Sequence, residues 1–447
     1  MCSRHTHLFP SAVFADLVCS LRAPATQGAE LAAVAECPWA LSRLPMKAES
    51  CAPTVIDEDA RARAAAFVVP RAALPRRVVV ALSGGVDSSV ALWLLKEQGH
   101  EVLGVSLRLA PDDGDSLAVR HGRCCSHDDL TDARRVADAV SAPFYAIDAR
   151  DRFKAAVFDP FVAAYRAGHT PIPCLACNHE VKLGDLLKTA RSLDAVLATG
   201  HYVRSVVRSF QGGSAAALAR PLDRRRDQTY WLYGTPHDVV ADLLFPLGEL
   251  DKPLVRALAL RAGLPIVAAK PDSQEICFVP DGDHAAVVER ASGPLPGGSL
   301  VHIGGKPLGQ HQGVHHFTVG QRRGTGVASP NEGERLYVVD VDATSGRVLL
   351  GPKEALATTL VRAAPLKTAQ ALSSWPAEIA AQVRARQPAQ AARWHIDDEG
   401  ALVVRFVEPV QGVALGQALV AYDGDVVLGG GVITGRLDGL VPRTEPN

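Results

Sequence analysis

A strand pattern that runs directly into a glycine- and serine-rich turn constrains the fold of this 447-residue chain most strongly. Residues 78–82 read VVVAL, an apolar run typical of a strand that is buried on both faces of a parallel sheet. The turn SGGVDSS follows at 83–89, and apolar residues at helical spacing continue until Gly99. Glycines let the backbone approach an anion, and the first helical turn offers unpaired N–H groups. The turn is therefore predicted to bind phosphate.

This turn differs from a Walker loop at its end. Asp87-Ser88-Ser89 stands where the Walker motif has a lysine followed by Ser or Thr, so a lysine that grips the γ-phosphate is not expected here. The alternative is a turn that only packs a helix on a sheet. Two glycines, three serines and one aspartate in seven residues are costly for packing alone, which favours the binding interpretation.

Size and composition indicate a protein of two or three domains with an ample core, because 47% of the 447 residues are apolar. The formal net charge of −1 gives no global signature of nucleic-acid binding, so a polyanionic partner would have to bind local patches. The basic runs at 220–226 and 321–323 are candidates, and solvated surface is the alternative for both.

Nine cysteines, an odd number, fit a reducing cytoplasm better than a disulfide framework. No apolar stretch is long enough to cross a membrane, and no membrane partner is expected.

The order of patterns predicts four regions. Residues 1–75 form a leader that is either disordered or an over-extended gene start. Residues 76–285 alternate strands with helices, which predicts an α/β domain with a doubly wound parallel sheet whose ligands lie at the carboxyl ends of the strands. Residues 286–352 form a small β-rich central domain without a convincing long helix, and 353–447 a C-terminal β-barrel.

The predicted elements of the α/β domain and the barrel can be given by residue number. The strands are expected at 101–109, 144–148, 195–199, 378–384, 401–406, 417–422 and 426–433. The helices are expected at 129–142, 150–167 and 180–192, with a loop at 170–178.

Two cysteines lie in settings that suit thiol chemistry. Cys177 comes just before a predicted helix, whose positive end would lower the thiol pKa. Cys277 ends the polar segment KPDSQEIC at 270–277. Two such thiols can form a reversible pair, in which one carries a persulfide sulfur and the other resolves the intermediate by thiol–disulfide exchange.

Together these motifs resemble the tRNA-specific 2-thiouridylase family, whose glycine-rich loop is that of the ATP pyrophosphatases. The resemblance runs from about residue 76 to about residue 435. Besides SGGVDSS it includes ATGHY at 198–202, RDQTYWL at 226–232, FTVGQRRG at 317–324, YDGD at 422–425 and GGG at 429–431. It implies an adenine nucleotide alpha hydrolase-like sheet and a tRNA-uridine 2-sulfurtransferase, which adenylates the 2-oxygen of the wobble uridine and replaces it with sulfur, yielding 2-thiouridine, AMP and pyrophosphate.

The resemblance also implies roles for particular residues. Cys177 matches the nucleophile and Cys277 the persulfide carrier, and the two close a transient disulfide. The ATP contacts are matched by Ala81, Leu82, Ser83, Gly84, Gly85, Val86, Asp87, Ser88, Leu107 and Gly200. The tRNA contacts are matched by Ile172, Pro173, Cys174, Arg226, Asp227, Gln228, Arg384 and Ala385. ATP, with Mg²⁺ to offset its charge, is the expected cofactor, and no resident metal is expected. The expected partners are the anticodon loop of tRNA and a sulfur donor protein that carries a persulfide.

The chain departs from the family pattern beside the nucleophile. Many members carry an aspartate with an acid/base role three residues before it, where this chain has Cys174. Ile172 replaces a common asparagine, and His179 a lysine. The spacing Cys174-x-x-Cys177 leaves two further interpretations, a zinc half-site or a disulfide that protects or competes with the nucleophile.

Other interpretations stay open at this point. The rival functions are an amide-forming ATP pyrophosphatase that uses ammonia, a catalytically silent tRNA-binding protein and a redox protein built on the Cys-x-x-Cys pair. Single residues also have structural alternatives to a functional role. For His201 the alternative is a hydrogen-bonded histidine at a strand end, and for Cys124 and Cys125 it is a packing role. For Tyr230 and Trp231 it is a place in the core, and for Arg384 and Arg386 a solvated position on a strand.

Overall fold

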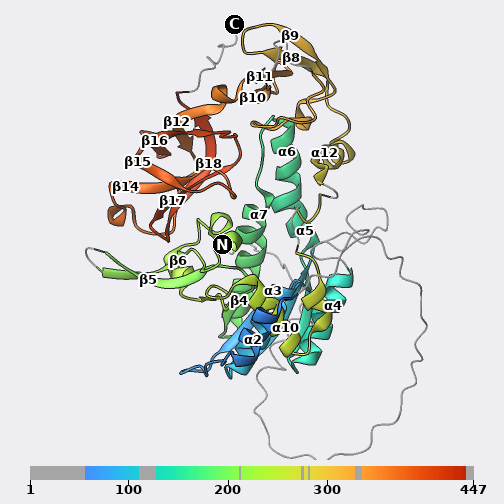
Figure 1. Cartoon of the computed structure of the whole chain (residues 1–447), viewed down its shortest axis with the longest axis vertical. Coiled ribbons are helices and arrows are strands. Elements are labelled where there is room, and N and C mark those ends of the chain that lie inside the picture. The colour runs from blue at the N-terminus through green and yellow to red at the C-terminus, as the bar shows by residue number, and fades with distance from the viewer. Residues whose placement is uncertain are drawn as a thin grey trace, which may run out of the picture.

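The computed structural model describes residues 56–109, 127–210, 213–272, 276–279, 282–327 and 335–438. A parallel sheet with its helices occupies one end of the molecule, and a second sheet and a β-barrel occupy the other (Figure 1). Helices α6 (Asp159–Arg166) and α12 (His284–Ser292) pack against each other between these ends. Among the described residues, no helix combines the length and the apolar character that crossing a bilayer requires.

The parallel sheet has the strand order β3-β2-β1-β4-β7. Its strands are β1 (Arg77–Ala81), β2 (Glu101–Arg108), β3 (Phe144–Asp148), β4 (Val196–Thr199) and β7 (Leu243–Leu244). Val79 faces one hydrophobic core, and Val78 and Val80 face another, so β1 is buried on both sides as its sequence predicts. The covering helices include α3 (Val86–Glu97), α4 (His127–Ala139), α8 (Leu183–Ser192) and α10 (Lys252–Arg261). The predicted doubly wound sheet is confirmed.

The helical stretch after β3 differs from its prediction. The predicted helix 150–167 consists of α5 (Arg150–Phe153), a π-helical turn (Lys154–Phe158) and α6. The loop predicted at 170–178 is wrong, because α7 (Pro173–Ala176) and a second π-helical turn (Cys177–Lys182) lead without a break into α8. Pro173 starts this helical run, since its fixed φ suits the first turn of a helix.

The end of the predicted leader also differs from its prediction. Residues Glu58–Ala66 form helix α2, which packs against α10 through the buried Ala60 and Ala64. Arg63 lies 2.6 Å from a carboxylate oxygen of Asp251. The disorder expected up to residue 75 is therefore wrong for this helix, while residues 1–55 lie outside the described residues.

The second sheet has the order β10-β11-β8-β9 around a small core of its own. Its strands are β8 (Gly298–His302), β9 (Pro307–His311), β10 (Tyr337–Asp342) and β11 (Arg347–Gly351). The β-rich character predicted for the central region is thus confirmed. The prediction overlooked α12, which lies directly before this sheet in the chain.

Six antiparallel strands close the C-terminal barrel, because β12 pairs with both β16 and β18. They are β12 (Ala357–Ala363), β14 (Glu378–Gln382), β15 (Gln390–Ile396), β16 (Leu402–Gln411), β17 (Ala418–Asp423) and β18 (Val426–Arg436), and the short β13 (Lys367–Thr368) pairs with β18. The predicted barrel is confirmed, although β12 and β15 were not predicted.

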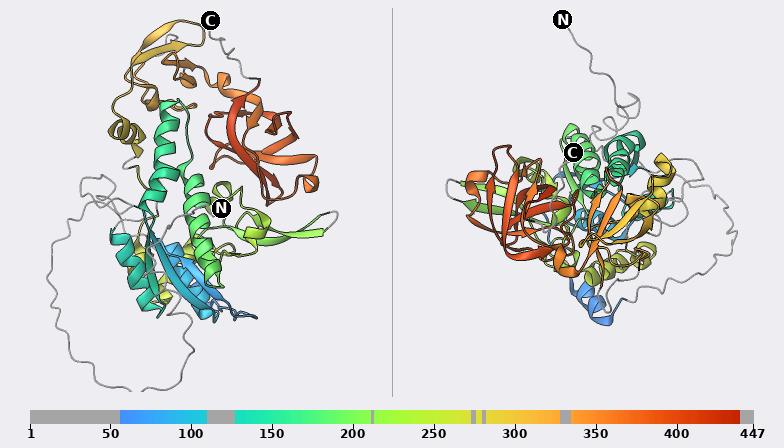
Figure 2. Two further views of the ribbon diagram at one scale, coloured as in Figure 1. Left: turned by 180° about the vertical axis from the view of Figure 1, so that it is seen from behind. Right: turned by 90° about the horizontal axis from the view of Figure 1, so that it is seen from above.

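A hairpin of the α/β domain docks against the barrel. Strands β5 (Arg204–Phe210) and β6 (Gly213–Ala219) form it, and Ala219 pairs with Val426 of β18. The hairpin lies beside the barrel in both views of Figure 2. The remaining short elements are α9 (His237–Val240), α11 (Pro265–Ala269) and 3-10 turns at Arg224–Arg226, Thr229–Trp231, Val314–His316, Lys353–Leu356 and Leu372–Ser374.

Candidate active site

The glycine-rich turn forms a closed loop between β1 and α3. The backbone N–H of Ser83 donates to Ser88 Oγ at 3.1 Å, and Ser89 Oγ donates to the carbonyl of Gly85 at 2.8 Å. Gly84 has φ +72°, and a Cβ there would lie 2.2 Å from the carbonyl oxygen of Asp129. Only glycine fits this position, because a side chain would collide with α4. The loop is thus tight, and the free N–H groups in the first turn of α3 lie directly behind it.

The other predicted nucleotide contacts lie on strands that neighbour this loop. Ala81 ends β1 and lies opposite Thr199 of β4, one residue before Gly200. A Cβ at Gly200 would lie 2.6 Å from the backbone nitrogen of Ser88, so β4 ends against the loop. Leu107 lies near the carboxyl end of β2. The structure thus gathers the predicted nucleotide residues at the carboxyl edge of the sheet, where doubly wound folds bind ligands.

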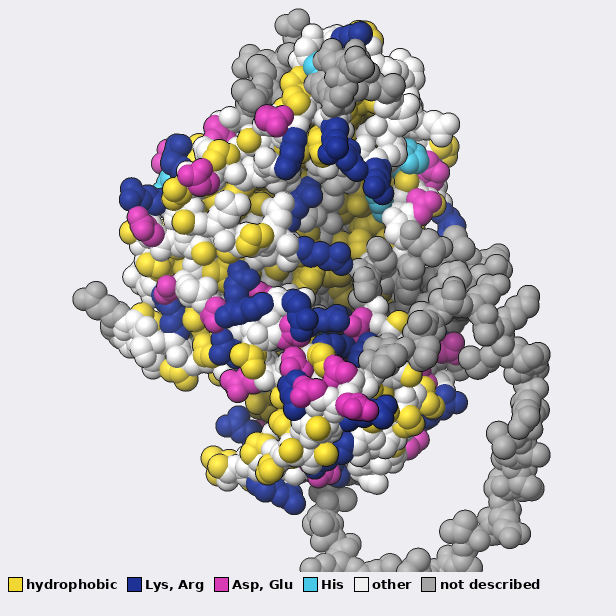
Figure 3. All heavy atoms as spheres, viewed as in Figure 1, with side chains coloured by type: hydrophobic (Ala, Val, Ile, Leu, Met, Phe, Trp, Pro, Cys, Tyr) yellow, Lys and Arg dark blue, Asp and Glu magenta, His cyan; other side chains and the backbone are white. Residues whose placement is uncertain are grey.

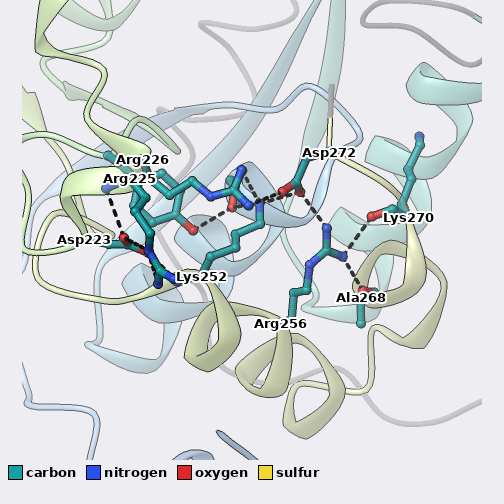
Figure 4. Close-up of polar contacts among 10 residues, drawn as sticks. Asp223, Arg225, Arg226, Lys252, Arg256, Ala268, Lys270 and Asp272 are labelled. Carbon is teal, nitrogen blue, oxygen red and sulfur yellow. Dashed lines mark hydrogen bonds and ion pairs between the residues drawn. The ribbon is translucent and has the colours of Figure 1, made fainter. Parts of the chain in front are cut away.

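A buried lysine connects the loop to the segment that leads to Cys277 (Figure 4). The amine of Lys252 lies 2.7 Å from one oxygen of Asp87 and 2.8 Å from an oxygen of Asp272. Its side chain is only 6% exposed, and Tyr202 donates a further hydrogen bond to Asp87 at 3.0 Å. One cation is therefore shared between the loop and a carboxylate five residues before Cys277.

Asp272 accepts two further cations. Arg256 lies 2.6 Å from this carboxylate and Arg226 lies 2.8 Å from it, so three basic side chains surround Asp272. Burial alone would raise the pKa of Asp272, but the hydrogen bond from Lys252 and the surrounding positive charges lower it below its ordinary value. The carboxylate stays ionised, and the group of Lys252, Arg256 and Arg226 with Asp87 and Asp272 has one net positive charge.

A second lysine ties the same segment to α4. Lys270 Nζ donates to the carbonyl of Gly84 at 3.1 Å, and it lies 2.5 Å from Asp129 and 3.1 Å from Asp132. No sequence pattern predicts a role for Lys252, Arg256, Lys270 or Asp272. Their partners lie far away in the chain, and only the position of KPD shortly before Cys277 hinted at them.

Both predicted catalytic cysteines lie near one helical stretch. Cys177 is 6% exposed and belongs to the same hydrophobic core as Phe153, while Cys277 is partly exposed. Phe278, beside Cys277, packs its ring against Phe153 at 5.5 Å and against Phe161 at 4.9 Å between ring centroids. The residues 150–166 therefore contact both cysteine segments.

Cys177 lies within a helical run and not just before one, so the predicted effect of a helix terminus on its thiol is wrong. The helical run begins at Pro173, so Cys174 lies in its first turn and Cys177 follows that turn. The influence of a helix terminus falls off within the first turn. Cys174, which is partly exposed, is the cysteine closer to the positive end of the helix.

Most of the predicted tRNA contacts make internal contacts. Asp227 accepts hydrogen bonds from Arg220 at 2.5 Å and from the backbone of Thr229 at 2.9 Å, and Gln228 accepts from the backbone of Tyr202 at 2.7 Å. These bonds hold the turn that presents Arg226, whose side chain is 39% exposed.

The remaining predicted contacts lie directly after β14 of the barrel and at the start of α7. Arg384 follows β14 rather than lying on it, and it donates to the carbonyl of Val319 at 2.5 Å. Burial lowers the pKa of its guanidinium. Ala385 accepts from Gln382 at 3.0 Å. Ile172 lies directly before α7, and Pro173 and Cys174 lie within it.

Other residues singled out in the sequence have structural contacts. His201 Nδ1 lies 2.8 Å from Thr199 Oγ1, and burial lowers its pKa to about 3, which keeps the ring neutral. Tyr230 is buried and donates to the carbonyl of Ala418 at 2.9 Å, as expected of a core aromatic. Cys124 and Cys125 lie outside the described residues.

Comparison with known proteins gives consistent matches along the chain. Residues 76–281 match the tRNA methyl transferase HUP domain, 287–352 the tRNA methyl transferase PRC-barrel domain and 360–433 the aminomethyltransferase beta-barrel domain. A tRNA-specific 2-thiouridylase from Bartonella henselae is 47% identical over 370 residues, which are 80% of this chain and 88% of that protein. The tRNA-specific 2-thiouridylase of Parvibaculum lavamentivorans is 48% identical over 374 residues, 80% of this chain and 90% of that protein.

Solved structures show only distant similarity. NMN synthetase from Francisella tularensis is 15% identical with a TM-score of 0.29, covering 53% of this chain and 86% of that one.

Proposed function

This chain belongs to the tRNA-specific 2-thiouridylase family, and on that basis we propose that it activates a tRNA uridine at the glycine-rich loop and sulfurates it through Cys177 and Cys277. It is a tRNA-uridine 2-sulfurtransferase that uses ATP. The proposed target is the wobble uridine, whose 2-oxygen attacks the α-phosphorus of ATP. Pyrophosphate leaves in this step, and AMP leaves when sulfur replaces the oxygen.

Residues 81–88 are proposed to hold the ATP pyrophosphate through backbone N–H groups and the serine hydroxyls, with Leu107 and Gly200 beside the nucleotide. Asp87 is the one carboxylate within the turn SGGVDSS, and its hard oxygens suit Mg²⁺. Since Asp87 already accepts from Lys252 and Tyr202, the ion would share this carboxylate with them. Mg²⁺ would offset the charge of the pyrophosphate.

Sulfur is proposed to arrive as a persulfide on Cys277, supplied by a donor protein. The terminal sulfur attacks C2 of the adenylated uridine either directly or after release as sulfide, and AMP leaves in both routes. In the first route the base is then bound to Cys277 through an S–S bond, and the Cys177 thiolate attacks the Cys277 sulfur, forms the Cys177–Cys277 disulfide and releases 2-thiouridine. In the second route the Cys177 thiolate attacks the inner sulfur of the persulfide, forms the Cys177–Cys277 bond and expels the outer sulfur as sulfide. A thiol reductant then restores both cysteines.

One observation supports this pairing of roles more than any other. Asp272 is tied through Lys252 to Asp87 of the loop, while Phe278 packs on the helical stretch 150–166, which contacts the π-helical turn that begins at Cys177. The described residues on the two sides of Cys277 thus contact the surroundings of the proposed nucleotide loop on one side and those of the proposed nucleophile on the other. Such a placement suits a sulfur carrier that must meet an adenylate made at the loop.

The tRNA is proposed to lie across the face shown in Figure 3. Lys and Arg side chains recur there along a hollow between the barrel and the α/β domain. We propose that the path of the anticodon loop is lined by Arg226, by the segment 172–174 and by Arg384 and Ala385. The target base leaves its stack to reach the loop, which single-stranded RNA permits at modest cost. The division into 76–285, 286–352 and 353–447 is proposed as the functional division of the chain.

A direct assay tests this function. Purified protein is incubated with ATP, unmodified tRNA and a low-molecular-weight persulfide, and AMP and 2-thiouridine are measured together. Equal amounts of the two are expected. An ammonia-using ligase would release AMP without 2-thiouridine, and a silent tRNA-binding protein would release neither.

The role of Cys174 is tested by Cys174→Ser. A milder loss of thiolation than in the variants of Cys177 and Cys277 is expected, because Cys174 is proposed to contact tRNA rather than to carry sulfur. The measurement is the rate of 2-thiouridine formation under a reductant and again under mild oxidation. A loss as complete as in Cys177→Ser would show that Cys174 is essential, and better survival of the variant under oxidation would reveal a competing Cys174–Cys177 disulfide.

The link through Asp272 is tested by Asp272→Asn. Removing one partner of a buried ion group costs about 3–5 kcal/mol, because the remaining charges lose their partner. We expect thiolation to fall by about 10-fold or more. The alkylation rate of Cys277 should also rise in the folded variant, since its segment is no longer held to Lys252.

Asp397→Asn is the matched control for this variant. Asp397 also pairs with an arginine, Arg362 at 2.7 Å, but it does so in the barrel. Equal thiolation and equal Cys277 alkylation in the two variants would contradict the proposed link.

A further inference from the structure

Outside the proposed active site, three ligand-bearing side chains converge between α12 and the 3-10 turn Val314–His316. The ring nitrogen Nε2 of His315 lies 3.0 Å from Glu289 Oε1, and Nε2 of His316 lies 3.2 Å from the same oxygen. All three donor atoms lie within 4.8 Å of one another. His315 is 0% exposed, while the side chains of His316 and Glu289 are 36% and 39% exposed, so the cluster is partly buried and stays accessible from solvent.

Hydrogen bonding accounts for only part of this arrangement. His315 is hydrogen-bonded to Glu289, whereas Nε2 of His316 is buried and has no hydrogen-bond partner among the described residues, although the carboxylate is near. A buried polar atom without a partner is unfavourable, because it has lost its hydrogen bonds to water. A cation between the three donors would satisfy this atom.

We propose that Glu289, His315 and His316 bind a divalent transition-metal ion of the zinc class. Two imidazole nitrogens and one carboxylate oxygen are a donor set that zinc uses in proteins. In a tetrahedral zinc site, donors with bonds of about 2.0–2.1 Å lie about 3.3 Å from one another. The separations of 3.0 and 3.2 Å are close to that edge length. Water would complete the coordination.

Two neighbouring histidines support the cluster without serving as ligands. Nδ1 of His311 accepts from the backbone of Gly313 at 3.0 Å, and its Nε2 lies 2.9 Å from the carbonyl of Gly346. His284 Nε2 lies 3.1 Å from the carbonyl of His315 and its ring stacks on Tyr165. Both rings thereby fix the turn that presents His315 and His316. Such outer contacts commonly orient metal ligands.

The ion would fasten the central domain to the helix that follows the Cys277 segment. Val287 and Val288 of α12 share a core with Val279 and Phe161, and Phe278 packs against it. Glu289 lies on the same helix, and the two histidines belong to the segment that leads into FTVGQRRG. A metal here would therefore stabilise the placement of the Cys277 segment without taking part in the sulfur chemistry.

Metal binding is tested on the full chain after chelator treatment and buffer exchange. Titration with Co²⁺ should give visible ligand-field bands of one bound ion per chain, without the near-ultraviolet charge-transfer absorption of cobalt thiolates. That spectrum separates the proposed site from binding by the cysteines. Zn²⁺ should displace the cobalt and raise the Tm.

Variants decide between a metal site and a hydrogen-bonded cluster. Glu289→Gln keeps an acceptor for the histidines but is a poor ligand. It should weaken Co²⁺ binding by at least about 10-fold, since even a change in the outer contacts of a metal ligand lowers affinity by this much. His316→Ala should do the same, while the control His395→Ala, an exposed residue of the barrel, should bind as the native chain does. Binding that is undetectable, or equally strong in all three variants, would overturn the site.

Discussion

Replacing either Cys177 or Cys277 with serine is expected to abolish 2-thiouridine formation, with a loss of at least about 10³-fold in rate. Serine at 277 cannot hold a persulfide, and serine at 177 is a far weaker nucleophile toward sulfur than a thiolate. Each substitution removes a step for which the proposed mechanism has no substitute. The rates are measured by mass spectrometry of nucleosides from digested tRNA.

The two variants should keep the first half of the reaction. Adenylation depends on the loop and not on the thiols, so one turnover of pyrophosphate release with unmodified tRNA is expected to survive in both. This readout also shows that the variants are folded. Substantial thiolation by either variant would refute the proposed roles, and loss of pyrophosphate release would mean that the cysteine acts before sulfur transfer.

Replacing Gly84 with alanine is expected to abolish ATP-dependent adenylation, lowering the rate by at least about 10²-fold. The new Cβ would lie 2.2 Å from the carbonyl oxygen of Asp129 at a φ of +72°, so the loop has to move away from α4. The backbone N–H groups would then no longer point at the pyrophosphate. Pyrophosphate release in the presence of tRNA is the measurement.

Gly263→Ala is the control that separates the loop from backbone strain. Gly263 has nearly the same φ, +74°, but a Cβ there would have no atom of the described residues within 4 Å. It should cost about 1–2 kcal/mol of stability from the left-handed conformation and leave adenylation intact. Equal ATP use in the two variants would show that the loop geometry at Gly84 does not matter for the nucleotide.

The sequence allowed the nucleotide edge of the sheet to be predicted because its signals are local. The apolar run of β1, the turn and the helix α3 are contiguous, so the periodicity and the glycines specify the unit directly. The helix start at Pro173 was not predicted, because prolines are typical of loops. A proline also suits the first turn of a helix, which is its place here. Helix α2 was missed because its buried face consists of alanines, which give no apolar period.

The charged part of the site could not be predicted because its contacts are not local. Lys252 is 165 positions away from Asp87, and Lys270 is 186 positions away from Gly84. Only the folded sheet brings these residues to one edge. The docking of the hairpin β5–β6 on the barrel depends in the same way on distant ion pairs, such as Arg208 with Asp423 at 2.9 Å.

A single turnover gives the most direct test of sulfur transfer between the two thiols. The chain is first loaded with persulfide on Cys277 and then mixed with ATP and unmodified tRNA without reductant. After alkylation and digestion, a disulfide between the peptides of Cys177 and Cys277 should appear in the same amount as 2-thiouridine. Formation of 2-thiouridine while Cys177 stays alkylatable, or a disulfide that joins Cys277 to Cys174 instead, would contradict the account.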